Sequence, residues 1–290
     1  MIKASRKPSA RGKKGQPAIA KGFSLIELLV VAAVLLIVLG AVVDYIATAI
    51  QRSRSEQTKV DLTQDGRAFV DEFERDLHQA GYPNCRMFNT GTNCSAHFSD
   101  RTMAVGLVSV SNTSITFEGD VDGDGNVDSV RYQLVDSSGN FPPASTCPCT
   151  LERSQIQKAN GTAPLLQATQ WSQELQNIVN SGVPGAGLAY GGGLPLSGNV
   201  AFAGGSMTNT AYYAAVASVK DFPVFSAYDQ DGAVVALPAD ITTSAGQQTL
   251  ASIKSVRLTI NLLGSATTGF DPKTGVRPLV TMVGESRINN

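Results

Sequence analysis

Lys21-Gly22-Phe23-Ser24-Leu25-Ile26-Glu27 runs directly into the apolar stretch Leu28–Val43, and this junction decides the N-terminal part of the fold. The 21 residues Phe23–Val43 contain one charged side chain, that of Glu27. As a helix they span about 31 Å, which matches the hydrocarbon core of a bilayer. An acid inside such a helix is costly, so Glu27 is a candidate functional residue. The alternative is that Glu27, about 6 Å along the helix from Phe23, only reaches back to the membrane interface.

The segment ahead of the apolar stretch is strongly basic. Its seven cationic side chains come without an acid, and they are Lys3, Arg6, Lys7, Arg11, Lys13, Lys14 and Lys21. Subtracting these seven charges from the whole-chain net charge of −1 leaves −8 for the chain from Phe23 onward. A basic flank predicts a cytoplasmic N-terminus with the rest of the protein outside. The exported part has no evident basic patch, so nucleic-acid binding is not indicated.

Two other kinds of targeting segment share the basic and apolar pattern. A secretory signal peptide has a shorter apolar core that ends in a small-x-small cleavage site. Here the sequence Gly40–Tyr45 continues as helix-compatible residues instead. An uncleaved signal anchor would also have a cytoplasmic N-terminus with the rest of the protein outside. A leader that is removed ahead of the apolar segment differs from both of these alternatives.

The basic leader, Gly22, Phe23 and the spacing to Glu27 together resemble the processing site of type IV prepilins and of type II secretion pseudopilins. The resemblance implies that a prepilin peptidase cuts after Gly22 and methylates the new N-terminus at Phe23. It implies that Glu27 pairs with the N-terminal amine of a neighbouring subunit in a filament. The implied partners are the peptidase, other major and minor pilins, an inner-membrane assembly platform and membrane lipid before assembly. The implied location is the inner membrane, as a single-pass protein with a periplasmic head, and then the pilus surface.

The helix is expected to continue beyond the membrane span. Residues 44–80 contain no proline, and the spacings from Leu62 to Phe69, Phe73 and Leu77 are those of an amphipathic helix with one buried face. Gly81 followed by Pro83 is typical of a helix end. The sequence therefore predicts one helix from 24 to 80, about 85 Å long. A membrane anchor followed by a separate soluble helix is the alternative, but no turn residues interrupt residues 44–65.

After Pro83 the composition changes to strands and turns. Residues 138–210 are rich in Gly, Pro, Ser and Ala and predict long irregular loops, with one short helix at Trp171–Val179. The expected fold class is α+β, with the long helix packed on a mainly antiparallel β-sheet head. The expected organisation is a cleaved leader over 1–22, a helix over 23–81 with its membrane part at 23–43, and an exported head over 82–290. The expected strands are Met103–Val110, Ser114–Phe117, Val127–Leu134, Tyr212–Val219, Phe222–Tyr228, Ala233–Leu237, Ile253–Leu263 and Arg277–Glu285.

A second resemblance concerns the head. The segments Phe73–Tyr82, Gly119–Gly125, Tyr228–Gly232 and Ile253–Ile260 resemble those of PilW-type minor pilins. The chain departs from major pilins because its exposed helix has no proline and its head is large, which favours a low-copy or tip component that primes assembly. A J-type pseudopilin of a type II secretion system shares the leader and the helix. A rival from another class is a membrane-anchored calcium-binding adhesin or enzyme that does not polymerise.

An enzymatic activity is not expected. The chain has two histidines, His78 and His97, too few for a convincing zinc site or catalytic triad. The G-x-S-x-G, Walker A and G-x-G-x-x-G motifs do not occur in the sequence. His78 is expected on the helix surface.

An acidic loop is the candidate metal site. Asp120, Asp122 and Asp124 occupy positions 1, 3 and 5 of an EF-hand-like loop, Gly125 is at position 6, and Asn126 and Asp128 are at positions 7 and 9. Hard oxygen ligands at alternate positions converge on one ion, which predicts Ca²⁺. Position 12 is Arg131 instead of glutamate, so completion requires another acid such as Glu118. The alternative is a solvated Asp/Gly turn between two strands.

Four cysteines lie in the exported part, where an oxidising compartment favours disulfides. Cys85 and Cys94 are the first choice because they close a short loop directly after the helix. Cys147 and Cys149 are separated by one proline, which makes a bridge between them tight but feasible.

Overall fold

The computed structural model describes residues 24–84, 87, 98–143, 146–180, 189–190, 200–202, 205–207, 219–264 and 277–288. The chain divides into two compact units, Met1–Ala47 and Thr48–Asn290. The second unit contains the C-terminal part of the long helix together with the head, so these two parts share one core.

Helix α1 extends over Leu25–His78, which confirms the expected continuous helix. Its first part exposes large apolar side chains, such as Leu36 and Ile37, and α1 has the length and composition of a membrane span. Farther along, the helix buries one face, as the spacing predicted, and Leu62 packs against the core from a partly buried position. The buried residues of α1 are Gly66, Phe69, Val70, Phe73, Asp76 and Leu77. Past the helix, Gly81 adopts a φ of 83° and donates its N–H to the carbonyl of Glu118.

The head is built on a nine-stranded sheet in the described part of the chain, with all neighbouring strands antiparallel. Its order is β10-β12-β6-β5-β3-β2-β1-β11, and β13 pairs with β12. The fold class is therefore α+β, as expected. The strands are β1 (Leu107–Val110), β2 (Ser114–Gly119), β3 (Asp128–Val135), β5 (Cys149–Gln157), β6 (Trp171–Ile178), β10 (Phe225–Tyr228), β11 (Ala239–Asp240), β12 (Ser255–Leu263) and β13 (Leu279–Arg287).

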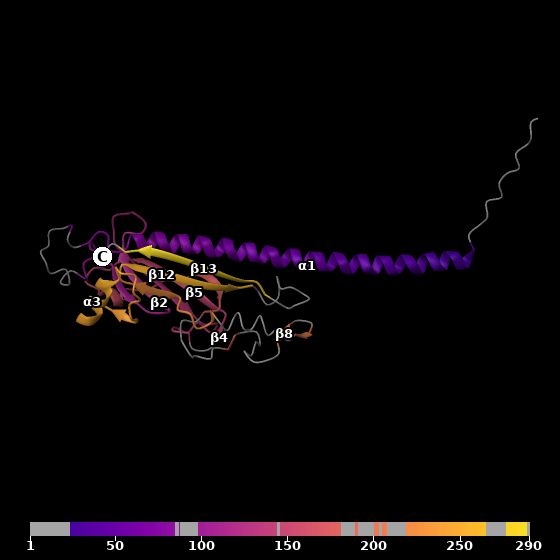
Figure 1. Ribbon diagram of the computed structural model, residues 1–290. Helices are drawn as coiled ribbons and strands as arrows, with labels where there is room; N and C mark the ends of the chain where they lie inside the picture. Colours follow the sequence, from indigo (N-terminus) through magenta and orange to yellow (C-terminus); the bar gives the residue numbers. More distant parts are fainter. Residues whose placement is uncertain are drawn as a thin grey trace, which may run out of the picture. The chain divides into compact units, whose positions relative to one another are not determined.

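Aromatic side chains fill the space between α1 and the sheet. The ring of Tyr132 on β3 makes edge contacts with Phe73 and Phe69, at centroid distances of 5.4 and 5.8 Å. Phe73 also contacts Phe225 on β10. Strand β13 lies alongside this part of α1 (Figure 1), and the N–H of Glu285 donates to the carboxylate of Glu74. The buried face of α1 thus closes the core of the head.

Short elements complete the described chain. Strand β4 (Thr146–Cys147) pairs in parallel with β7 (Ala189–Tyr190), and β8 (Val200–Phe202) pairs with β9 (Gly205–Met207). A 3-10 turn, η3, covers Pro164–Leu166. Helix α3 (Ser244–Ser252) is preceded by Thr243, whose hydroxyl accepts the N–H of Gly246 and caps the helix. Helix α3 was not predicted from the sequence.

The short helix predicted at 171–179 is wrong, because these residues form strand β6. Trp171, Leu175 and Ile178 recur at helical spacing, which imitates an amphipathic helix. In the sheet, Leu175 and Ile178 both face inward because the β5–β6 register shifts between them and Asn177 adopts a φ of 64°. This irregularity adds a residue and restores the inward direction. Pairing with β5 therefore overrides the local pattern.

Three other expectations need correction or lie outside the structure. The irregular loop predicted over 138–210 contains β5, a central strand, besides β6. The strand predicted at Ala233–Leu237 is wrong, since only an isolated bridge between Tyr228 and Val234 forms there and Val234 is exposed. Most of the strand expected at Tyr212–Val219 lies outside the described residues.

Candidate functional site

The N-terminal site is described from Ser24 onward, and Gly22 and Phe23 lie outside the described residues. Glu27 is in the first turn of α1, and its N–H donates to the carbonyl of Ser24. Its neighbours Ile26 and Leu28 are about 70% exposed, so the carboxylate lies within an apolar helix surface. A carboxyl group in such surroundings must either become protonated or pair with a cation once the surface is buried in lipid or protein. The geometry therefore suits Glu27 for pairing with a positively charged group.

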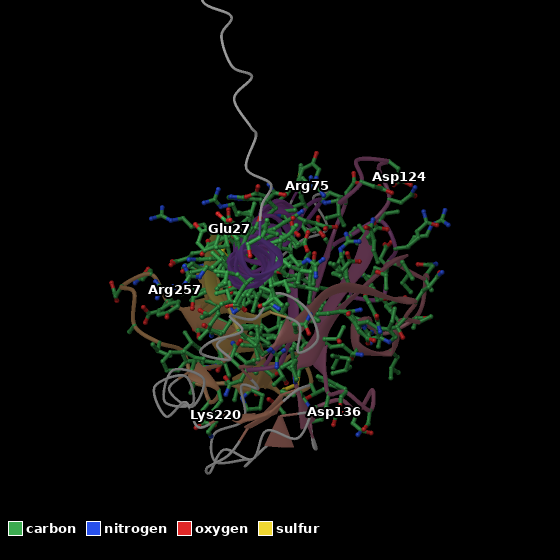
Figure 2. The ribbon with its side chains drawn as sticks, turned by 90° about the vertical axis from the view of Figure 1, so that its right-hand side faces the viewer. Glu27, Arg75, Asp124, Asp136, Lys220 and Arg257 are labelled. Carbon is green, nitrogen blue, oxygen red and sulfur yellow. A yellow bond between two sulfur atoms is a disulfide. The ribbon has the colours of Figure 1, made fainter. Side chains whose placement is uncertain are left out.

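The acidic loop joins β2 to β3 and carries Asp124 on its exposed turn (Figure 2). Carboxylate oxygens of Asp120, Asp122 and Asp124 lie within 4.8 Å of one another. Calcium–oxygen distances of about 2.3–2.6 Å allow oxygens with this separation to share one ion. Gly125 has a φ of 85°, which permits the turn expected at position 6. The structure thus brings together positions 1, 3 and 5 of the predicted metal loop.

Hydrogen bonds within the loop hold the same carboxylates. Asp120 accepts the N–H groups of Gly123 and Gly125, at 2.9 and 3.1 Å. Asp124 accepts the side-chain amide and the N–H of Asn126, and these bonds lower the pKa of Asp124. The loop is therefore already ordered as an Asp/Gly turn, with the oxygens gathered on one side of it.

Asp128 is not one of the three clustered acids, and it has a hydrogen-bond partner of its own. It is buried at the start of β3 and accepts a hydrogen bond from the Gln155 side chain at 2.7 Å. Burial raises the pKa of Asp128, the Gln155 bond opposes this shift, and the nearby carboxylates of the loop raise the pKa further. A cation bound at the loop would reverse the effect of those carboxylates on Asp128.

The two residues considered for position 12 both have partners of their own. The Arg131 guanidinium donates to the carbonyls of Pro164 and Leu165 at 3.1 Å. Glu118 is buried and bonded to Lys158, with Nζ 2.6 Å from Oε2. Burial raises the pKa of Glu118, and the Lys158 cation opposes this rise. An ion in the loop would therefore need ligands other than Arg131 and Glu118 to complete its shell.

The cysteines are described only in part. Cys147 and Cys149 form a disulfide across Pro148, and both side chains are buried in the core. A tight but feasible bridge was expected between these two cysteines. Cys85 and Cys94 lie outside the described residues, so their pairing stays a prediction.

Sequence reasoning missed a buried polar cluster that attaches α1 to the head. Asp76 on α1 accepts hydrogen bonds from the Tyr132 hydroxyl at 2.8 Å and from the Arg153 guanidinium at 2.6 and 3.0 Å. Asp76 is 1% exposed. The only signal in the sequence was a carboxylate three residues from Phe73 on the apolar face of the helix. His78 is exposed on α1, as expected.

Comparison with known families gives one match. The model of the prokaryotic N-terminal methylation motif matches residues 19–43. The matched segment contains Gly22, Phe23 and Glu27 and the apolar first part of α1. No curated protein and no solved structure matches the chain.

Proposed function

We propose that this type IV prepilin-like chain is a minor pilin of the PilW type, which primes assembly of a pilus or occupies its tip. The observation that carries the proposal is the methylation motif at residues 19–43. The peptidase would release the leader after Gly22 and methylate Phe23. Glu27 would then neutralise the N-terminal amine of a neighbouring subunit when the apolar helices pack together.

The structure supports this role through the two parts of α1. The first part exposes a continuous apolar surface, which suits lipid before assembly and other helices afterwards. The second part belongs to the core of the head, so the head is attached directly to the element that would enter the filament. A helix with one part for the filament and one part in the head suits a structural component that displays an acidic head.

Processing and assembly are separable in one experiment. Mass spectrometry of the membrane fraction should find the mature N-terminus at Phe23, methylated. Gly22→Val should block cleavage, whereas Glu27→Ala should leave cleavage intact and reduce recovery in sheared filaments at least tenfold. Glu56→Ala, which removes an exposed acid farther along α1, is the matched control and should behave as wild type. An intact leader, or cleavage beyond Val43, would exclude the proposal.

The same fractions distinguish a pilin from a J-type pseudopilin. If the chain is a PilW-type component, deletion of its gene should abolish surface pili and leave secreted enzyme activity unchanged. Loss of secretion with normal pili would instead assign the chain to a type II secretion system. A head that never leaves the membrane fraction would favour a non-polymerising anchored protein.

We also propose that the loop Asp120–Asp128 binds Ca²⁺, on the basis of the three gathered carboxylates. An ion that binds only the folded chain stabilises it by about 2.7 kcal/mol at a concentration of 100 Kd. The melting temperature of the full chain in detergent should therefore be higher in millimolar calcium than in chelator. Asp122→Ala with Asp124→Ala should remove the difference. Asp231→Ala, in the second Asp/Gly turn, should retain it. Equal melting temperatures for the wild type would leave only the turn interpretation.

A further inference from the structure

Strand β6 has an open edge next to α1. On one side, β6 pairs with β5 from Trp171 to Ile178. On its other side, β12 meets β6 only where Leu262 pairs with Ile178. Among the described residues, no strand pairs with this second edge over residues 171–177. An open strand edge presents backbone donors and acceptors to which another extended chain can pair.

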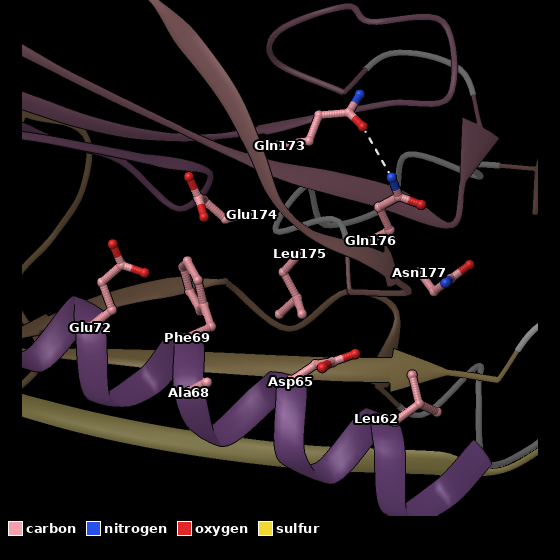
Figure 3. Close-up of a pocket in the computed structure, with 10 residues that line it drawn as sticks. All are labelled: Leu62, Asp65, Ala68, Phe69, Glu72, Gln173, Glu174, Leu175, Gln176 and Asn177. Atoms are coloured by element: carbon pink, nitrogen blue, oxygen red, sulfur yellow. Dashed lines mark hydrogen bonds between the residues drawn. The ribbon is translucent and has the colours of Figure 1, made fainter. Parts of the chain in front are cut away.

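A groove follows this edge. It has a volume of about 440 Å³, and the residues Gln173–Asn177 of β6 form one wall while α1 forms the other (Figure 3). Side chains alternate between the two faces of a strand. All five consecutive residues Gln173–Asn177 line the groove, so the groove runs along the backbone of this strand. The groove therefore gives access to the open edge of β6.

The groove has an apolar floor and an acidic rim. Phe69 of α1 and Leu175 of β6 contribute to the floor, and both are buried. Three carboxylates line the rim, those of Asp65, Glu72 and Glu174. Figure 3 shows Glu72 and Glu174 on facing walls at the same end of the groove.

Arg153 is a positively charged side chain near the rim, but it pairs more closely with an acid outside the groove. Arg153 lies 3.6 Å from Glu72 but only 2.6 Å from Asp76, to which it donates two hydrogen bonds. Burial raises the pKa of Glu72, Arg153 opposes this shift, and Glu174 raises the pKa again. The rim therefore retains an excess of negative charge that a cationic partner would relieve.

We propose that this groove binds an extended, lysine- or arginine-bearing segment of a partner protein, which adds to β6 as a further strand. Backbone pairing to β6 supplies affinity, and the alternate side chains of the segment reach the acidic rim. A second copy of this chain fits poorly, because its part beyond the leader carries a net charge of −8 and repels the same acids. The proposal requires no filament, so it stands or fails independently of the proposed pilin function.

The test uses a fluorescent nine-residue peptide of alternating threonine and lysine, titrated against the full chain in a non-ionic detergent. We expect saturable binding that weakens with salt, and slowed amide hydrogen exchange over residues 172–176 of β6. Asp65→Asn with Glu174→Gln should raise the Kd at least tenfold. The matched control is Asp61→Asn with Asp71→Asn, which removes two exposed acids of α1 outside the groove and should change the Kd less than twofold.

Two further peptides separate strand addition from simple charge attraction. A peptide with glutamate in place of lysine should not bind. A lysine peptide N-methylated at every second backbone nitrogen keeps its charge but loses donors, and it should bind at least tenfold more weakly. Equal affinity of the methylated peptide, or equal loss in the groove and control variants, would overturn the proposal. Failure of the lysine peptide to bind would also overturn it and leave the acids as protection of the edge against aggregation.

Discussion

At the scale of single residues, the ion pair of Lys158 with Glu118 lies fully inside the head. Lys158 also donates to the carbonyl of Met103 at 2.8 Å. Lys158→Met leaves the Glu118 carboxylate buried and unpaired, so unfolding should become easier by about 3–5 kcal/mol at pH 7. Chemical denaturation of the full chain in detergent measures this loss.

The loss from Lys158→Met should depend on pH. Burial raises the pKa of Glu118, so the folded state binds protons more readily than the unfolded state. Stability from the neutral acid is then present at low pH and is lost as pH rises through the folded pKa. The variant should therefore lose less at pH 4.5 than at pH 7. Adding Glu118→Gln should recover part of the loss at pH 7, and an equal loss at both pH values would contradict this account.

At Asp128, removal of the charge is expected to increase the free energy of unfolding. Its pKa is raised by burial and by the loop carboxylates, so its charge opposes folding at neutral pH. Asp128→Asn should raise stability in chelator by up to about 1 kcal/mol at pH 7, since one pKa unit corresponds to about 1.4 kcal/mol. The Asn oxygen still accepts from Gln155. The gain should disappear at pH 3, where the acid is neutral. A loss at pH 7 in chelator would show that the Asp128 charge is stabilising.

At the scale of elements, the attachment of α1 to the sheet depends on Asp76. Asp76→Ala leaves the Arg153 guanidinium without its closest carboxylate, and the unfolding free energy should fall by about 3 kcal/mol. Tyr132→Phe removes one hydrogen bond to Asp76 and should cost about 1 kcal/mol. Arg75→Ala is the control, because Arg75 is 67% exposed and lies 3.8 Å from Asp76, and it should change stability by less than about 0.5 kcal/mol. Thermal and denaturant unfolding measure the stability of all three variants. An Asp76→Ala variant as stable as the wild type would contradict the role of this cluster.

Elements differ in how far local sequence specifies them. Helix α1 was predictable because its apolar spacing and its Gly81 end signal lie in adjacent residues. Strand β5 was not, because it lies within residues 138–210, whose content of Gly, Pro, Ser and Ala predicted loops. Arg153 is accommodated inside the protein by several partners, of which the buried carboxylate of Asp76 is 77 residues away in the chain. Contacts of that sequence separation leave no local pattern.

At the scale of the whole molecule, the compact unit Thr48–Asn290 predicts where the chain can be shortened. A chain beginning at Thr48 should be soluble and should unfold cooperatively, within a few degrees of the full chain. A chain beginning at Gly81 lacks the buried face of α1, which uncovers Tyr132 and Phe225, so it should not fold. Near-ultraviolet circular dichroism and calorimetry decide both outcomes. A folded product of the shorter chain would show that the head does not need α1.

The candidate sites also divide into those formed by neighbouring residues and those formed by distant segments. The processing motif and the acidic loop are contiguous in sequence, and the comparison and the gathered carboxylates support them. The groove between α1 and β6 was not predictable, because its walls come from segments about 100 residues apart and one of them was expected to be a helix.

The sequence by itself determined the membrane-length helix, its amphipathic continuation, the methylation motif and the α+β class. These properties depend on the order and period of neighbouring side chains. The tertiary structure alone decided that residues 171–178 pair as a strand, that Glu118 pairs with Lys158, and that an acidic groove opens beside β6. The physical reason is that strand pairing and buried charge pairs are settled between distant segments, where the free energy of packing outweighs local preference.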